Sequence, residues 1–379
     1  MLALVKTKLN DTEKRLVADL LAKSFSSNNN EMKNHFNKKL ENAPGKTFIL
    51  VQNDNSLVGV LLLVDRVMNY CGVPLSACGM SYMATDPAVK SLSASKLIKE
   101  KLFELWDTKV ISLGFARKAM DGYWYPYGFL GFTDFGEMKF FLKSIKMPEP
   151  HGKITIEPIV HNDIMAVDML YTTSYQSLIG NLVRNKEQWL HIIDKSIDLE
   201  SVLLKICLNE KIIGYFYYQD NRILELGCRE PDRGLMLSCI KSFFNNKKFD
   251  EIIFNINLNH PFLKFFENMS HSQTQRFVFE GGHILRINKV PVFFESIHPV
   301  LEKRLQSNNL KRFSTEFEGI HFNYDGHKLS IEYDNEFEEN DNLRRDLTHL
   351  VFGMTDQNDL SKRILFPKCY SQVPEADQF

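Results

Sequence analysis

The order of predicted elements over residues 80–135 limits the fold more than any other feature of the chain. The pattern predicts a strand at Met80–Thr85, a helix at Pro87–Lys101 and a second strand at Val110–Ala116. The segment Tyr127–Phe132 follows closely behind the second strand. A helix that joins two such strands covers one face of a sheet, so this stretch predicts an α/β architecture with a central sheet.

Length and composition indicate a globular protein of several domains. A chain of 379 residues is too long for one ordinary domain and suggests two or three. Hydrophobic residues make up 44% and charged residues 25%, which is usual for a soluble protein. The net charge of −1 gives no basic field that would attract nucleic acid or an acidic membrane, so neither is an expected partner.

The sequence also predicts a cytoplasmic protein without a metal. No run of about 18 apolar residues occurs, and Met1–Val5 is too short an apolar stretch for a signal sequence. The six cysteines form no CxxC pair and have no histidine at metal-ligand spacing, so we expect buried free thiols. His260, His271 and His283 are too irregularly spaced to suggest a ligand set.

The order of elements recurs along the chain. Two strands joined by a short turn are predicted at Thr47–Val64 and again at Val202–Gln219, each followed by a strand, a helix and a strand. An internal duplication is the preferred explanation, and chance recurrence of a common α/β order is the alternative. The proline-rich stretch Ser144–Gly152 suggests a boundary. We therefore expect α/β domains at 1–148 and 149–290 and a small α+β domain at 291–379.

Residues 80–135 resemble the core of a GNAT N-acetyltransferase. The family's fingerprint, Arg/Gln-x-x-Gly-x-Gly/Ala, follows the fourth strand, and the matching residues here are Lys90, Ser93 and Ser95. Such a turn wraps backbone N–H groups around the pyrophosphate of coenzyme A at a helix N-terminus. Lysine keeps the cation but cannot form a bidentate fork, and each serine adds a Cβ where glycine allows close approach. An ordinary Ser-x-Ser helix cap is the alternative interpretation.

The resemblance implies which backbone groups hold the co-substrate acetyl-CoA. On the predicted strand and at the turn these are Met83, Ala84, Thr85, Lys90, Ser91, Ser93, Ala94, Ser95 and Lys96. The segment that starts at Tyr127 also matches the family's Tyr-x-x-x-Gly-Phe pattern. In the family this tyrosine protonates the departing thiolate, for which a phenol with a pKa near 10 is suitable. A packed aromatic lid, or Tyr125 as the proton donor, is the alternative.

The whole chain is similar to acetyltransferases of the Eis (enhanced intracellular survival) type. The segments Arg184–Trp189, Leu285–Pro291 and Leu350–Gly353 carry this resemblance in their order. It implies tandem GNAT-like domains, the second degenerate, and a C-terminal domain like a sterol carrier protein. It also implies that the carboxylate of the terminal Phe379 acts as the general base. A frayed terminus is the alternative.

Together these features predict an acyltransferase. We expect transfer of an acetyl group from acetyl-CoA to an amine on a small molecule (an aminoglycoside or amino sugar) or on a lysine, by a protein that forms homo-oligomers. The eroded glycine turn supports a different hypothesis. In that reading the chain is a non-catalytic binding or assembly protein on a GNAT scaffold that has lost coenzyme A binding.

Overall fold

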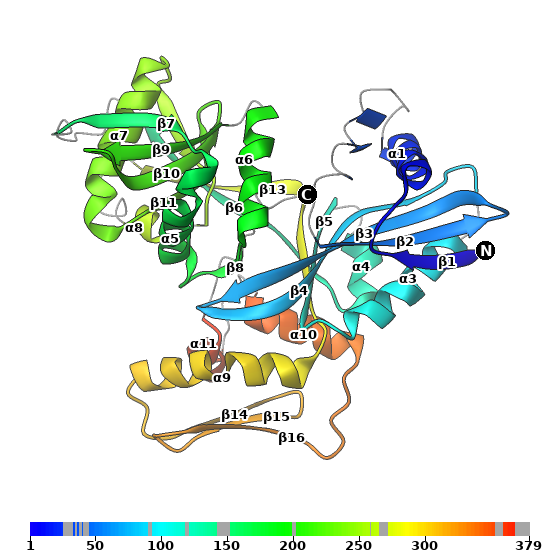
Figure 1. Ribbon diagram of the computed structural model, residues 1–379. Helices are drawn as coiled ribbons and strands as arrows, with labels where there is room; N and C mark the ends of the chain where they lie inside the picture. The colour runs from blue at the N-terminus through cyan, green and yellow to red at the C-terminus, as the bar shows by residue number, and fades with distance from the viewer. Residues whose placement is uncertain are drawn as a thin grey trace.

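The computed structural model describes residues 1–25, 33–34, 36–37, 40, 45–89, 93–117, 121–141, 152–198, 202–257, 259–264, 272–352 and 359–367. The described strands form one mixed sheet of thirteen strands and a separate sheet of three (Figure 1). Within these residues, no helix combines the length and the apolar character that crossing a membrane requires.

The first unit supplies one end of the large sheet. Its strands are β1 (Leu2–Lys6), β2 (Lys46–Asn53), β3 (Ser56–Tyr70), β4 (Val73–Thr85) and β5 (Ile111–Arg117). β1 to β4 are antiparallel neighbours, and β5 runs parallel to β4. Phe48 and Leu50 of β2 pack beneath α1 (Asp11–Phe25), whereas Ile49 and Val51 point to the opposite face and pack beneath α3 (Ser93–Trp106). Because both faces are covered, the strand is a continuous apolar run.

The second unit supplies the other end. Its strands are β7 (Ile154–Pro158), β9 (Val202–Leu208), β10 (Lys211–Gln219), β11 (Arg222–Cys228) and β12 (Glu251–Phe254). Its helices are α5 (Ile164–Tyr175), α6 (Lys186–Asp198), α7 (Arg233–Asn246) and the short α8 (Pro261–Lys264). One core cluster joins α5 and α6 to the sheet, and a second joins α7 to the other face. The two units therefore share one layered arrangement, which supports the duplication.

The first hairpin of each unit is built in the same way. The turns Asp54–Asn55 and Asn209–Glu210 place both residues at positive φ, 48° and 67° in the first and 48° and 68° in the second. Such turns match the twist of the strands they join. A glycine follows each turn at the same spacing. A Cβ on Gly59 would lie 3.1 Å from Ile98 of α3, and a Cβ on Gly214 would lie 2.2 Å from Met236 of α7. Glycine thus lets each helix approach the sheet.

Three of the described strands pair with strands of the other unit and so link the two units. β13 (Ser272–Ile287) lies between β5 and β6 (Leu130–Phe141), and β6 in turn pairs with β12. Ile284 pairs with Gly114 of β5 on one side and with Gly131 of β6 on the other. β8 (Ile179–Leu182), which follows α5, pairs with β3 of the first unit. The sheet therefore runs through both units without a break, and the expected domain boundaries stay a prediction.

The third segment packs beneath the first unit (Figure 1). It comprises α9 (Val290–Ser307), β14 (Phe313–Phe317), β15 (Ile320–Tyr324), β16 (Leu329–Tyr333), α10 (Asp341–Phe352) and α11 (Leu360–Leu365). A tight turn at Asp325–Gly326 joins β15 to β16. Phe293 and Phe294 of α9 share a core cluster with Ile111 of β5, so this segment is anchored to the large sheet.

Candidate active site

The neighbouring strands β4 and β5 separate in the middle of the first unit. They pair from Ala77–Ile111 to Met80–Gly114. Beyond that point β4 continues to Thr85 beside β3, and β5 continues beside β13. A Cβ on Gly114 would lie 3.2 Å from the terminal methyl group of Met80, so glycine leaves room for this side chain where the strands part. Among the described strands, none pairs with the other edge of β4 at residues 81–85.

A β-bulge reshapes β4 at this opening. The pairs Val60–Ala84 and Leu62–Ser81 enclose one more residue on β4 than on β3. Tyr82 takes up the irregularity with φ of 50°, an uncommon conformation for a bulky residue. The ring centres of Tyr82 and Phe36 are 5.3 Å apart, and burial raises the pKa of the Tyr82 phenol. The bulge therefore changes the direction of the backbone at Met83, one of the predicted coenzyme contacts.

The other predicted contacts on β4 are already partly engaged. The side chain of Ala84 is buried beneath α1, and the carbonyl of Thr85 accepts a hydrogen bond of 3.2 Å from Ser24 Oγ. Only the remaining backbone groups of this edge are left to meet a ligand. The next residues form a turn rather than the predicted helix from Pro87, because the carbonyl and carboxylate of Asp86 accept the N–H groups of Val89 and Ala88.

The helix that was expected to hold the pyrophosphate begins at Ser93 and ends at Trp106. Ser93 is exposed and Ser95 is half-buried in its first turn, which contains no acidic residue. Ala94 is buried against the sheet beside Gly59, so only its backbone is available to a ligand. Lys96 is exposed and lies 3.9 Å from Glu100. Lys90 and Ser91 lie outside the described residues.

Tyr127 ends a short helical turn and points toward α3. α4 (Asp121–Trp124) leads into a 3₁₀ turn, Tyr125–Tyr127, whose proline favours this tight geometry. Lys99 Nζ of α3 donates a hydrogen bond of 2.8 Å to the Tyr127 hydroxyl and lies 4.2 Å from the ring centre of Tyr123. Partial burial opposes the charge on Lys99, but its hydrogen bonds to the two phenols raise its pKa overall. Tyr127 is therefore placed beside a cation.

The backbone of Tyr127 is held from the opposite side. Arg286 Nε of β13 donates a hydrogen bond of 2.8 Å to the Tyr127 carbonyl, and another nitrogen of the same side chain lies 3.1 Å from Asp341 of α10. Gly128 has φ of 78°, and a Cβ there would lie 3.0 Å from the Asp341 carbonyl. The third segment therefore fixes this turn. The sequence had singled out Leu285–Pro291 but gave Arg286 no role.

The structure also separates the two candidate tyrosines. Tyr125 is 46% exposed, and the guanidinium of Arg345 on α10 lies 4.6 Å from its ring centre. Tyr127 instead packs against Phe103 of α3, with ring centres 5.5 Å apart. Phe379, the predicted general base, lies outside the described residues.

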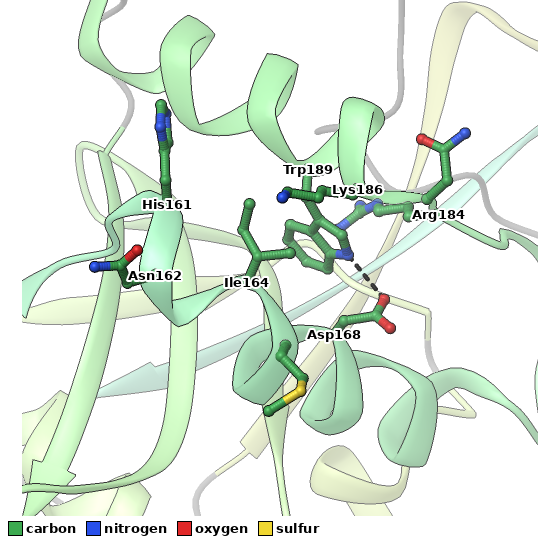
Figure 2. A pocket seen from close by; sticks show the side chains of 9 residues that line it. His161, Asn162, Ile164, Asp168, Arg184, Lys186 and Trp189 are labelled. Carbon is green, nitrogen blue, oxygen red and sulfur yellow. Dashed lines mark hydrogen bonds between the residues drawn. The ribbon is translucent and has the colours of Figure 1, made fainter.

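A hollow of about 330 Å³ lies in the second unit, between the beginnings of α5 and α6 (Figure 2). Its wall contains Trp189, whose indole N–H donates a hydrogen bond of 2.8 Å to Asp168. Behind the indole, the buried Arg184 forms two hydrogen bonds, of 2.8 and 2.5 Å, with the carboxylate of Glu225. The Arg184–Trp189 motif is thus a packed, ion-paired core element beside the hollow.

Metal-ligating side chains gather at a different place. Among the described residues, Glu316, His321 and Asp334 bring three such groups together on the sheet of the third segment. His321 Nε2 lies 2.7 Å from Asp334, and this contact raises the pKa of the histidine. The imidazole is therefore engaged by a carboxylate.

Comparison with known proteins identifies the fold. No protein-family model and no curated protein matches the sequence. A protein of Enterococcus faecalis, described as a probable N-acyltransferase, superposes with a TM-score of 0.63 over 88% of this chain and 86% of that one, at 16% identity. A GCN5-related N-acetyltransferase of Anabaena variabilis gives 0.61 over 88% and 86%, at 15% identity. Eis1 of Mycobacterium abscessus gives 0.56 over 87% and 85%, at 9% identity.

The chain has the fold of these three proteins. The predicted α/β class with mixed sheets is thereby confirmed. Identities this low show the fold alone. The likeness of the third segment to a sterol carrier stays a prediction.

Proposed function

We propose that the protein is an N-acyltransferase that binds acetyl-CoA where β4 and β5 separate. The observation that carries the proposal is the edge of β4 at residues 81–85, which has β3 on one side and no described strand on the other. An extended pantetheine arm can pair with such an edge as an added strand does. The N-terminus of α3, free of acidic residues, provides backbone N–H groups and a positive dipole end for the pyrophosphate.

The reaction follows from this placement. Backbone N–H groups near Met83 would polarise the thioester carbonyl. The nitrogen of the acceptor amine would attack the acyl carbon, and the carbon–sulfur bond would break as the amide bond forms. Tyr127 would give its phenolic proton to the departing thiolate, while the Phe379 carboxylate would take the proton lost by the amine. Holding both reactants side by side would supply much of the acceleration.

Several finer features belong to the same proposal. The acceptor would be an amine on an aminoglycoside, on an amino sugar or on a lysine, and the protein would work as a homo-oligomer in the cytoplasm. Residues 1–148 would form the catalytic domain, 149–290 a degenerate second domain, and 291–379 a domain like a sterol carrier. The pyrophosphate would be held by the turn residues, namely Lys90, Ser91, Ser93, Ala94, Ser95 and Lys96.

Stabilisation by acetyl-CoA tests the proposal. A ligand at about 100 times its dissociation constant stabilises the folded state by about 2.7 kcal/mol, so acetyl-CoA should raise the melting temperature measurably. Tyr127→Phe should keep this shift and lose most of the turnover with an amine acceptor. No shift at millimolar acetyl-CoA would instead support a binding or assembly protein that has lost the coenzyme.

A further inference from the structure

We propose that a second copy of this chain pairs with β14, so that the small sheets of the two copies join into one. β14 is an edge strand of the sheet β14–β15–β16 (Figure 1). Among the described strands, only β15 pairs with it. An unpaired edge offers a row of backbone N–H and C=O groups to another extended chain. The inference places the contact of the proposed homo-oligomer and does not depend on acetyl transfer.

The hydrogen bonds of the small sheet fix which groups of β14 face outward. The N–H and carbonyl of Leu329 bond to side chains of α9, so this residue of β16 points away from β15. Residues of an antiparallel strand face one side and then the other in turn. Tyr324, opposite Leu329, therefore faces β14 at Phe313. The same alternation leaves the backbone groups of Ser314 and Glu316 pointing outward from the sheet.

The other strands at the ends of the two sheets are less suited to meet a second copy. On β16, the side chains of Glu302 and His298 already bond to the backbone of Leu329. β7 ends in Pro158, which has no N–H to donate to a ladder. β1 ends in Lys6, and lysine protects an edge strand from pairing. Of the edges compared, β14 is the one suited to pairing with a second copy.

β14 is complementary to itself in one register. With a two-fold axis at Thr315, all five residues of the strand are paired, and Ser314 lies opposite Glu316 of the other copy. The outward N–H and C=O groups of these two residues then bond each other on both sides of the axis. A shift by one residue would turn the side chains to the wrong face of the sheet, and a shift by two would leave part of the strand unpaired.

The side chains agree with this register. On the inner face, Phe313 comes opposite Phe317 of the other copy, and both rings are only partly buried against the core cluster. Aromatic pairs across strands stabilise a sheet. Beyond the strand, the exposed Arg312 comes beside the exposed Glu318 of the other copy, and neither forms an ion pair with another described residue. Because opposite charges meet on both sides of the axis, the edge fits a second copy of this chain.

A disulfide at the two-fold axis tests the contact directly. Thr315 faces its own copy as a non-bonded antiparallel pair, in which Cα atoms lie about 4.5 Å apart, a separation that a disulfide can span. Mild oxidation should therefore link Thr315→Cys chains in pairs, above the level of the wild-type protein with its six native cysteines. Ser314→Cys is the matched control, because the two copies of this residue lie too far apart. No link in Thr315→Cys, or equal linking in both variants, overturns the proposal.

Sedimentation velocity provides the second readout. Ser314→Pro removes an N–H that points outward and none that bonds β15, so the fold should persist while self-association is lost. Ser314→Ala keeps the N–H and should associate as the wild-type protein does. Circular dichroism checks that both variants are folded. A wild-type protein that is monomeric at every concentration overturns the proposal, as does association unchanged in folded Ser314→Pro.

Charge reversal tests the register without touching the backbone. Arg312→Glu brings two like charges together across the axis, and Glu318→Arg does the same with the opposite sign. Each change alone should weaken self-association by about tenfold, most strongly at low salt. The double variant restores opposite charges and should associate as the wild-type protein does. Equal weakening in the double variant would overturn this register.

Discussion

The strand β4 continues through residues 81–85 after its last pair with β5, and β11 continues through residues 224–228 after its last pair with β12. Both strands carry an irregular step in pairing with the preceding strand of their unit. The last residue of each strand accepts a hydrogen bond of 3.2 Å from a serine. Ser24 Oγ donates to the Thr85 carbonyl, and Ser174 Oγ donates to the Cys228 carbonyl. The two openings are thus the same construction made twice.

The residue after each serine distinguishes the two openings. Phe25 is 44% exposed and has no hydroxyl. Tyr175 is 3% exposed, and its ring lies tilted against that of the buried His260, with ring centres 4.7 Å apart. Its hydroxyl accepts a long hydrogen bond of 3.5 Å from the Leu226 N–H. Met83 lies two residues before Thr85, and Leu226 lies two residues before Cys228, so Leu226 corresponds to Met83. The second unit therefore covers with its own side chain the backbone group that corresponds to Met83, which is a proposed contact of the coenzyme.

The approaches to the helices that follow are alike in charge. The 3₁₀ turn that leads into α7 contains Glu230 and Asp232, but these acids are paired with Arg233 and Arg229. The first turns of α7 and α3 both contain no acid. The comparison teaches that the two openings differ in their filling: the buried Tyr175 closes the second, whereas the corresponding Phe25 of the first is exposed.

The largest expected effect comes from the core of the second unit. Arg184→Met would leave the carboxylate of Glu225 buried without its cation, which should lower the free energy of unfolding by about 3–5 kcal/mol. Urea denaturation measures this. Replacing both residues by apolar ones, in Arg184→Met with Glu225→Leu, should recover much of the loss. A single variant as stable as wild type would contradict a structural role for this pair.

Acid should destabilise the folded protein through His260, which packs beside the second opening. Burial, and to a smaller extent Arg233, lowers the pKa of His260 to about 3 from 6.5. Between these values the unfolded chain binds a proton that the folded protein does not. The free energy of unfolding should therefore fall as the pH drops from 6.5 toward 3, by at most about 1.4 kcal/mol per pH unit from this residue.

His260→Asn provides the control for the acid effect. Asparagine keeps an acceptor near the position of Nδ1, which accepts the Phe262 N–H at 3.2 Å. Urea denaturation at pH 7 and pH 5 should show a smaller pH dependence in this variant than in the wild-type protein. An equal pH dependence would assign the effect to other groups.

An acid placed on α3 should weaken the proposed binding of the pyrophosphate at the first opening. Ser93→Asp adds an acid to the first turn of α3, where the pyrophosphate is proposed to bind. We expect acetyl-CoA to bind about tenfold more weakly, or about 1.4 kcal/mol, while the helix itself gains slightly in stability. Isothermal titration calorimetry measures the affinity. Ser93→Asn, uncharged and of nearly the same shape, should bind as wild type, and equal weakening in both variants would mean that shape rather than charge matters.

The smallest expected effect concerns the hydroxyl of Tyr175. Tyr175→Phe removes one long hydrogen bond to the Leu226 N–H, so the free energy of unfolding should fall by about 0.5–1.5 kcal/mol. Thermal unfolding detects this change. Acetyl-CoA affinity should stay as in wild type, because the variant alters the second opening alone.

The sequence predicted the repeated framework because that framework is local. The turns Asp54–Asn55 and Asn209–Glu210 have turn-forming residues between apolar runs, and both hairpins were predicted. β13 shows no such local signal over its first part, which is polar and contains glycine. Two partner strands, β5 and β6, extend it to Ser272.

The surroundings of the candidate site could not be predicted in the same way. Lys99 and Tyr127 lie 28 positions apart, and Arg286 lies 159 positions beyond Tyr127, so neither contact leaves a periodic signal. The motif at Leu285–Pro291 marked the right segment without showing what Arg286 touches. The contrast between Phe25 and Tyr175 likewise has meaning only once the two serine contacts are known.

The position of β13 has a consequence for synthesis of the chain on the ribosome. β5 and β6 are made well before the strand that is to lie between them, and β6 also waits for β12. Until then their edges offer unpaired backbone groups to any extended neighbour. We therefore expect the nascent polypeptide to depend on protection by chaperones until about residue 287 has emerged, and fragments cut between the halves to aggregate rather than fold.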